Sequence, residues 1–244
     1  GGDGEFDWQT KIDTFQGLAC STSFQYDYPK DDRITEEQKE YIEHFVDELQ
    51  RTLASKEFND PETGYNKFLD ASSFIDFFLI QELAHNVDAY KSSTYLHKKR
   101  NSEGGKLHAG PIWDFNLSLG NTTGCEGEST EGWALDHPCN PAQIPFWWKR
   151  LAQDSAYSEQ LNVRWRALRT GVLSNENLIS DIDSTVAELG NATERNFRRW
   201  PVLGEKVWPN YFVGATYQEE IDYLKEWLLK RVEWMDENLP NTTE

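Results

Sequence analysis

The most constraining feature of the chain is the run SSFIDFFLIQELAHN at residues 72–86, which is apolar on nearly every face of a helix. A helix of this kind is usually central in a fold, because other elements must cover all of its sides. The run is shorter than the roughly 18 apolar residues that a membrane-spanning helix needs. Asp70 or Ser72 can cap its first turn. We therefore expect a globular fold built around this helix, with no membrane span.

The composition limits the partners that such a fold can have. The chain has 244 residues, of which 38% are apolar and 14% aromatic, as in folded domains and unlike disordered chains. Its formal charge of −18 repels nucleic-acid backbones and anionic lipid surfaces, so we expect neither as a partner. A cationic protein partner, or an anionic substrate neutralised by a metal ion, is compatible with this charge.

Hydrophobic spacing predicts that most of the remaining chain is helical. Thr35 and Gln38 have the spacing of a capping box, and a helical pattern follows them as far as Leu53. Residues 145–238 predict further helices, with Gly190 at an end or weak point.

The middle of the chain has a different pattern, which predicts a β-hairpin. Residues 92–100 and 106–115 are strand-like and are separated by the turn sequence NSEGG. A further short strand is predicted at SFQYDY, residues 23–28. The predicted fold class is α+β and mostly helical, with a small central hairpin, in a single domain of residues 1–244.

Polar side chains flank this hairpin on both sides. Asn86 and Asp88 lie between the apolar helix and the first strand, and Asp114 and Asn116 follow the second strand. Because the outer ends of paired strands lie close together, the four side chains can meet across a cleft. Carboxylate and amide oxygens suit a hard divalent cation. Strand alternation in DFN predicts that Asp114 and Asn116 point to the same side.

The local sequence is also compatible with a purely structural role for these residues. Asp88 can satisfy backbone donors at the end of the apolar helix, and DFN can form an ordinary turn, since Asp and Asn are common turn residues.

Longer segments around these residues resemble the spore-coat-protein-H (CotH) kinase family. The segments that carry the resemblance are SFIDFFLIQELAHNVDAYKSSTYLHKK and GKLHAGPIWDFNLSLGN, and RWRALRTGVLS, ERNFRRWP and YLKEWLLKRVEWMDENL are similar to the C-terminal half of that family. The resemblance extends from about Tyr28 to Leu239. It implies an atypical protein kinase that uses ATP with Mg²⁺ or Mn²⁺ to phosphorylate Ser or Thr hydroxyls of a protein.

The resemblance also implies roles for individual residues. Asp88 matches the catalytic aspartate that orients the substrate hydroxyl or accepts its proton, and Asp114 matches the metal-binding aspartate. Asn116 is a second candidate for the same cation, and Asn86 is a candidate for contact with the nucleotide. Ser93 stands five residues after Asp88, where ordinary kinases place a second metal-binding Asn.

Two features of ordinary kinases are missing from the pattern. The chain has no G-x-G-x-x-G loop, and no apolar strand with a central lysine precedes HNVDAY. The resemblance therefore implies the C-terminal lobe of such a kinase, without the N-terminal lobe that grips the nucleotide, and we expect this chain alone to be inactive. The alternative is a non-catalytic surface-binding module that retains the fold. The implied location is bacterial and extracytoplasmic or at the cell surface, and the expected substrate is basic or Ser/Thr-rich.

Arginines near the C-terminal end of the resemblance are a further candidate site. ATERNFRRWP places Arg195, Arg198 and Arg199 on one or two helical faces. Arginine binds phosphate in a bidentate manner, so these residues indicate a phosphate or acidic-peptide site, with Arg195 as the first candidate. Internal ion pairing with the abundant acidic residues is the alternative.

Cysteines, tryptophans and histidines give less specific signals. A Cys125–Cys139 disulfide would close one loop and contribute about 3 kcal/mol, which leaves Cys20 over. The tryptophans at helical spacing, such as those in PFWWKR, RWRALR, RRWP and EWLLKRVEW, indicate core packing more than a sugar-binding platform. The five histidines match no standard zinc spacing.

Overall fold

The computed structural model describes residues 6–12, 14–16, 18–30, 32–136 and 144–239. Within this part, seven α-helices make up most of the regular structure, and the strands form three separate two-stranded antiparallel sheets. The predicted α+β, mostly helical class is confirmed. The helices are α1 (Glu36–Ala54), α2 (Ala71–Ala84), α3 (Trp147–Leu151), α4 (Ser155–Arg169), α5 (Asn175–Leu189), α6 (Ala192–Arg199) and α7 (Tyr217–Asn238), with short 3₁₀ turns η1 (Tyr65–Lys67), η2 (Asn101–Glu103) and η3 (Ala134–Asp136).

The strands are only two or three residues long. The pairs are β1 (Trp8–Gln9) with β4 (Ser23–Phe24), β2 (Thr14–Phe15) with β3 (Leu18–Ala19), and β5 (Leu96–Lys98) with β6 (Leu107–Ala109). The predicted hairpin is therefore present, with η2 in its turn, but its strands are shorter than predicted. The strand predicted at residues 23–28 is reduced to Ser23–Phe24.

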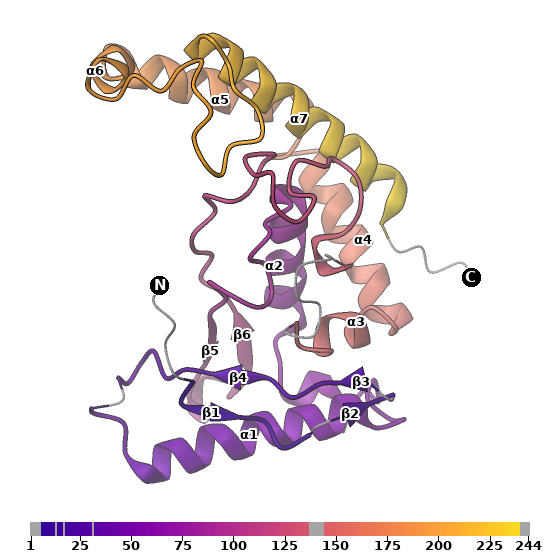
Figure 1. The fold of residues 1–244 in the computed structure, drawn as a ribbon. Coiled ribbons are helices and arrows are strands. Elements are labelled where there is room, and N and C mark those ends of the chain that lie inside the picture. Colours follow the sequence, from indigo (N-terminus) through magenta and orange to yellow (C-terminus); the bar gives the residue numbers. More distant parts are fainter. Residues whose placement is uncertain (1–5, 13, 17, 31, 137–143, 240–244) are drawn as a thin grey trace.

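Helix α1 begins at the capping box that the sequence predicts. The Thr35 hydroxyl accepts a hydrogen bond from the Gln38 N–H (3.3 Å), and the Gln38 side chain accepts one from the Thr35 N–H (2.9 Å). The helix buries Leu49 and Leu53 completely and packs on α3. With β1–β4 it forms the base of the molecule (Figure 1).

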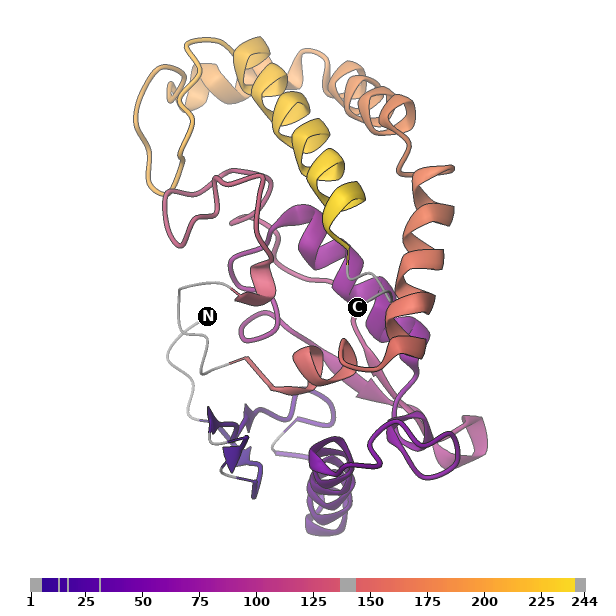
Figure 2. The same ribbon diagram turned by 90° about the vertical axis from the view of Figure 1, so that its right-hand side faces the viewer.

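Helix α2 stands at the centre of the fold, as its all-round apolar sequence predicts. Asp70 is the cap, since its carboxylate accepts a hydrogen bond from the Ser73 N–H (2.9 Å). Helices α4 and α7 and strand β6 pack around α2 (Figures 1 and 2). None of the helices in the described ranges has the length and apolar character that crossing a membrane requires.

Helices α5, α6 and α7 form a helical arm over the top of α2 (Figure 1). The single helical pattern at residues 175–200 is divided at Gly190, which ends α5 with φ 44°, so that α6 follows as a separate short helix. Helix α7 returns along α5 toward α2 (Figure 2).

The tryptophans are divided between the core and the surface. Trp147, Trp148, Trp165 and Trp227 are buried, as expected from their helical spacing. Trp200 is 56% exposed, so the core prediction is wrong for this residue. The reason is local: Trp200 is the extended residue that ends α6 (φ −129°, ψ 92°), and its side chain leaves the helical face.

The cysteine prediction is tested only in part. Cys125 is disulfide-bonded. Cys139 lies outside the described residues, so the Cys125–Cys139 pairing stays a prediction. Cys20 is buried, and its thiol donates a hydrogen bond to the Ile12 carbonyl (3.3 Å).

Candidate functional site

The end of α2 presents one carboxylate to solvent. His85 takes a left-handed conformation (φ 44°, ψ 50°) and ends the helix, and residues 85–94, here called the Asp88 loop, turn away from its axis. Asn86 is 1% exposed, and its side chain donates to Gln81 Oε1 (3.0 Å) and accepts from the Asp88 N–H (3.2 Å). Among residues 81–90, only Asp88 is not buried. Residues 85–90 are therefore buried except for Asp88, which stays partly accessible to solvent.

A second segment runs beside this loop. Strand β6 ends at Ala109, and residues 110–123, here called the Asp114 segment, have no regular structure. Asp114 itself has φ 60°. The prediction that strand alternation aims Asp114 and Asn116 to one side is therefore wrong, because the strand stops five residues before Asp114. Asp114 and Asn116 are nevertheless both exposed.

Hydrogen bonds join the two segments along their length. The Val87 N–H donates to the Leu117 carbonyl (3.3 Å), and the Leu119 N–H donates to the Ala84 carbonyl (2.7 Å). At the other end, the Ser93 hydroxyl donates to the Asp114 carboxylate (3.3 Å). The chain thus brings together two loops that are about 26 positions apart, and it places Asp88 and Asp114 on adjoining segments.

The groups near Asp114 are oxygen donors of the kind that a hard cation accepts. The Asp114 carboxylate and the Ser93 hydroxyl are in contact, and Asn116 follows two residues later. Both Ser93 (φ 47°) and Asp114 (φ 60°) hold left-handed backbone conformations, which non-glycine residues rarely adopt. Backbone strain at two residues whose side chains are in contact is typical of functional sites.

Lys91 is a basic residue of this region that the sequence interpretation missed. It is partly buried in the Asp88 loop, and burial lowers the pKa of its ammonium group, while the nearby Asp88 carboxylate opposes that shift. Its position three residues after Asp88 was the available signal. A cation at this place can attract an anionic substrate toward Asp88.

A buried ion pair supports the Asp88 loop from behind. Glu82 on α2 and Arg231 on α7 are both fully buried, with Glu82 Oε2 and Arg231 Nη2 3.4 Å apart. The Tyr90 hydroxyl, two residues after Asp88, donates to Glu82 Oε1 (2.9 Å), as do the backbone N–H groups of Ala134 (2.7 Å, to Oε2) and Leu135 (3.0 Å).

Arg231 completes this network with backbone acceptors. Its guanidinium donates to the carbonyls of Glu82 (2.8 Å), Gly132 (2.7 Å) and Thr130 (3.1 Å). Burial raises the pKa of Glu82 to about 7, against the opposing effect of Arg231, and lowers the pKa of Arg231 to about 10. The network joins α2, α7, the Asp88 loop and residues 130–135 at one point.

The other predicted site residues have clear positions. The side chain of Asn86 is committed to Gln81 and to the Asp88 backbone, which favours positioning of the loop over direct contact with a nucleotide. Arg195 lies on α6, at the outer end of the helical arm (Figure 1), and is not in the cluster around Asp114. Within the described part of the chain Arg195 forms no ion pair, so internal ion pairing does not account for it.

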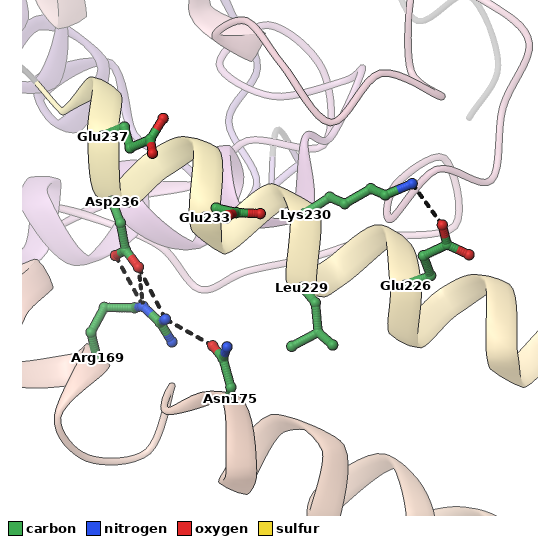
Figure 3. Close-up of a pocket in the computed structure, with 8 residues that line it drawn as sticks. All are labelled: Arg169, Asn175, Glu226, Leu229, Lys230, Glu233, Asp236 and Glu237. Carbon is green, nitrogen blue, oxygen red and sulfur yellow. Dashed lines mark hydrogen bonds and ion pairs between the residues drawn. The ribbon is translucent and has the colours of Figure 1, made fainter.

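A surface pocket in another part of the molecule has a different character. It has a volume of about 370 Å³ and lies between α7 and the junction of α4 and α5 (Figure 3). Arg169 is bound there to Asp236 and Asn175, and Lys230 to Glu226. Because these cations are already paired with acids, the pocket is poorly suited to a phosphate.

A protein-family model matches most of the chain. The family model described as CotH kinase protein matches residues 14–235, which is most of the chain and includes both the Asp88 loop and the Asp114 segment. No curated protein matches the chain.

Proposed function

Because the chain belongs to the CotH kinase family, we propose that it carries the carboxylates with which an ATP-dependent protein kinase phosphorylates Ser or Thr hydroxyls. The contact of the Asp88 loop with the Asp114 segment is the observation that supports this proposal most strongly. Phosphoryl transfer requires mainly positioning and neutralisation of charge, and a pair of carboxylates on adjoining loops can supply both.

Asp88 has the properties of the group that handles the substrate proton. It is the one residue among residues 85–90 that is not buried, and its backbone N–H is held by Asn86. In the proposed mechanism the Asp88 carboxylate accepts a hydrogen bond from the incoming hydroxyl, orients its oxygen toward the phosphorus, and takes up the proton as the new bond forms. Asn86 acts through the backbone and not on the substrate.

Asp114, Ser93 and Asn116 fit a magnesium or manganese ion by the chemistry of their donor atoms. The described residues contain no group of three His, Cys, Asp or Glu side chains that could enclose a metal. Mg²⁺ commonly takes only one or two protein carboxylates and completes its shell with phosphate oxygens and water. Such an ion would neutralise charge on the phosphates of ATP. Asp114 would hold it, with the Ser93 hydroxyl and the Asn116 amide as neighbouring oxygen donors.

Lys91 adds a positive charge on the side of Asp88. Its depressed pKa and partial burial mean that the ammonium group gains more from an anionic neighbour than a fully hydrated lysine does. We assign it to attraction of the transferring phosphate group. We assign binding of the α- and β-phosphates of ATP to a lysine-bearing N-terminal lobe of the full-length protein. In that proposal these 244 residues form the lobe that carries the two carboxylates.

A kinase assay on the full-length protein with Mn²⁺–ATP and a Ser/Thr-rich protein substrate tests the proposal. Asp88→Asn should reduce phosphoryl transfer by about 10³-fold with little effect on nucleotide affinity, since a general base contributes that much. Asp114→Asn should reduce both transfer and Mn²⁺–ATP affinity. The substitution Asp32→Asn is the matched control, because Asp32 is an exposed acid, 80% accessible, in a different part of the chain.

The alternative is a non-catalytic binding module that retains the fold. In that case wild-type protein would transfer no phosphate, and Asp114→Asn would leave Mn²⁺–ATP binding unchanged. Normal transfer by the Asp88→Asn variant would remove the role assigned to Asp88.

A further inference from the structure

The surface formed by α6 and residues 200–211 is unusual for this protein in both polarity and charge. Thirteen large apolar side chains are exposed in the described part of the chain, and five of them lie within residues 200–211. They are Trp200 (56%), Val202 (41%), Val207 (41%), Trp208 (83%) and Tyr211 (51%). Large exposed apolar patches on soluble proteins commonly mark interaction sites.

The same surface is basic, although the chain as a whole has a charge of −18. Residues 192–211 contain four basic residues and two acidic residues, Glu194 and Glu205. Arg195 and Arg198 form no ion pair within the described ranges, and the Arg199 guanidinium lies over the ring of Trp200 (5.3 Å). Arg195, Arg198 and residues 199–211 together form what we call the α6 surface.

The exposure of these side chains is not a consequence of a loose segment. The Gly204 N–H donates to the Gly214 carbonyl (2.8 Å), and the N–H of Gly214 donates to the Glu220 carboxylate (2.6 Å). Phe212 stacks on Tyr223 of α7 with ring centroids 4.4 Å apart. On α6, Phe197 packs against Tyr217 (5.7 Å), which turns the arginines outward. The fold thus anchors the segment by its inner side chains and still leaves Trp208 exposed.

The C-terminal part of the α6 surface adjoins the end of the Asp114 segment that lies farthest along the chain from Asp114. The Thr123 N–H, at the end of the Asp114 segment, donates to the Pro209 carbonyl (3.0 Å). The Tyr223 ring that carries Phe212 donates through its hydroxyl to the Gly120 carbonyl (3.1 Å). Both views show residues 200–216 beside the loops that follow the Asp114 segment (Figures 1 and 2). A protein chain bound at this surface can therefore extend toward Asp114.

We propose that the α6 surface is a docking site for an acidic protein segment with interspersed apolar side chains, which belongs to the protein substrate and is separate from the phosphorylated hydroxyl. Charge complementarity supports this occupant. Arg195 and Arg198, which form no ion pair with other described residues, attract carboxylates, for which their planar donor groups are well shaped. The exposed tryptophans supply apolar contact area. The identity of the partner as a substrate rests on the proposed kinase function, whereas the binding chemistry does not.

Fluorescence anisotropy with a defined peptide tests the docking site without relying on activity. The probe is a fluorescein-labelled peptide in which Asp and Glu alternate with Leu and Phe. Two comparison peptides replace the acids by Lys, or the apolar residues by Ser. Only the original peptide should bind well, and its affinity should fall as salt is added.

Two variants and two matched controls complete the experiment. The double variant Arg195→Glu/Arg198→Glu and the variant Trp208→Ala should each weaken binding by about tenfold or more, as expected when charged or tryptophan anchors of an interface are lost. Arg33→Glu and Tyr28→Ala change an arginine and an aromatic residue that are similarly exposed elsewhere, and they should leave binding unchanged. Circular dichroism should show that all four variants remain folded.

Failure of this proposal is distinguishable from failure of the kinase proposal. Selective binding of the acidic peptide by a wild-type full-length protein that transfers no phosphate leaves the docking site and removes the kinase function. Transferase activity without selective binding of the acidic peptide overturns the docking site. Self-association, or binding to phosphatidylserine vesicles, that Arg195→Glu/Arg198→Glu abolishes would also overturn it, in favour of a second copy or a membrane as occupant.

Discussion

The network behind the Asp88 loop and the α6 surface use arginine in opposite ways. Arg231 is fully buried, and Glu82 and three backbone carbonyls take its donors. Arg195 and Arg198 are exposed and form no ion pair within the described segments. The comparison teaches that position in the fold, and not residue type, decides whether an arginine stabilises the structure or is available to a partner.

The largest expected effect is on the buried side of this comparison. Arg231→Leu leaves the Glu82 carboxylate buried without its cation and three carbonyls without a donor, so we expect a loss of about 3–5 kcal/mol of stability. Urea denaturation measures it. Arg195→Leu is the matched substitution on the exposed side and should change the free energy of unfolding by less than about 0.5 kcal/mol. Similar losses of stability in the two variants would contradict the difference that we draw between the buried Arg231 and the exposed Arg195.

The pH dependence of stability gives a second test of the buried ion pair. Burial raises the pKa of Glu82 from its ordinary value of 4.5 to about 7. A group with a raised folded-state pKa contributes stability that is fully present below the unfolded pKa and is lost as the pH rises through the folded pKa.

The expected result follows from that sign. The stability of the wild-type chain relative to Glu82→Gln should fall by about 3 kcal/mol between pH 4.5 and pH 7, since each pKa unit corresponds to about 1.4 kcal/mol. Urea denaturation at several pH values measures this difference. A relative stability that rises with pH would mean that attraction to Arg231 outweighs the effect of burial on Glu82.

A smaller effect is expected where the network meets the Asp88 loop. Tyr90→Phe removes the hydrogen bond from the Tyr90 hydroxyl to Glu82 and keeps the ring. We expect a loss of about 1–2 kcal/mol of stability, because the acceptor is a buried acid. In the full-length kinase kcat should fall while the KM for ATP stays the same, since the loop that carries Asp88 loses one of its anchors. A raised KM with unchanged kcat would contradict this positioning role.

The smallest effect is expected for the exposed arginines of α6. Arg195→Ser combined with Arg198→Ser should change the free energy of unfolding by less than about 0.5 kcal/mol, because neither side chain forms an ion pair with another described residue. Thermal denaturation measures the change. A loss of more than about 1 kcal/mol would show that these arginines stabilise the fold, and it would remove the contrast with Arg231.

Local sequence patterns predict the parts of the fold that local interactions determine. The capping box at Thr35, the cap at Asp70 and the central position of α2 all follow from residues within a few positions of each other. The break at Gly190 follows from the conformational freedom of glycine, which adopts a positive φ there.

Contacts between distant residues set the features that the sequence does not reveal. The Asp114 segment leaves the strand after Ala109 and is held by the end of α2, through bonds such as Leu119 N–H to the Ala84 carbonyl. Glu82 and Arg231 are 149 positions apart, so no local pattern indicates that they pair. The contact between the Asp88 loop and the Asp114 segment was predictable only because the hairpin between them is short.

Manganese broadening of amide resonances is the most direct test of the claim that the Asp88 loop and the Asp114 segment form one metal–nucleotide site. In an NMR titration of the 244-residue chain, Mn²⁺–ATP should selectively broaden the amide signals of Ser93, Asp114 and Asn116, even when binding is weak. Asp114→Asn, which retains a residue suited to the left-handed backbone, should abolish the broadening, and Asp32→Asn should not. Broadening confined to other parts of the chain, or unchanged by Asp114→Asn, would contradict the assignment of this site.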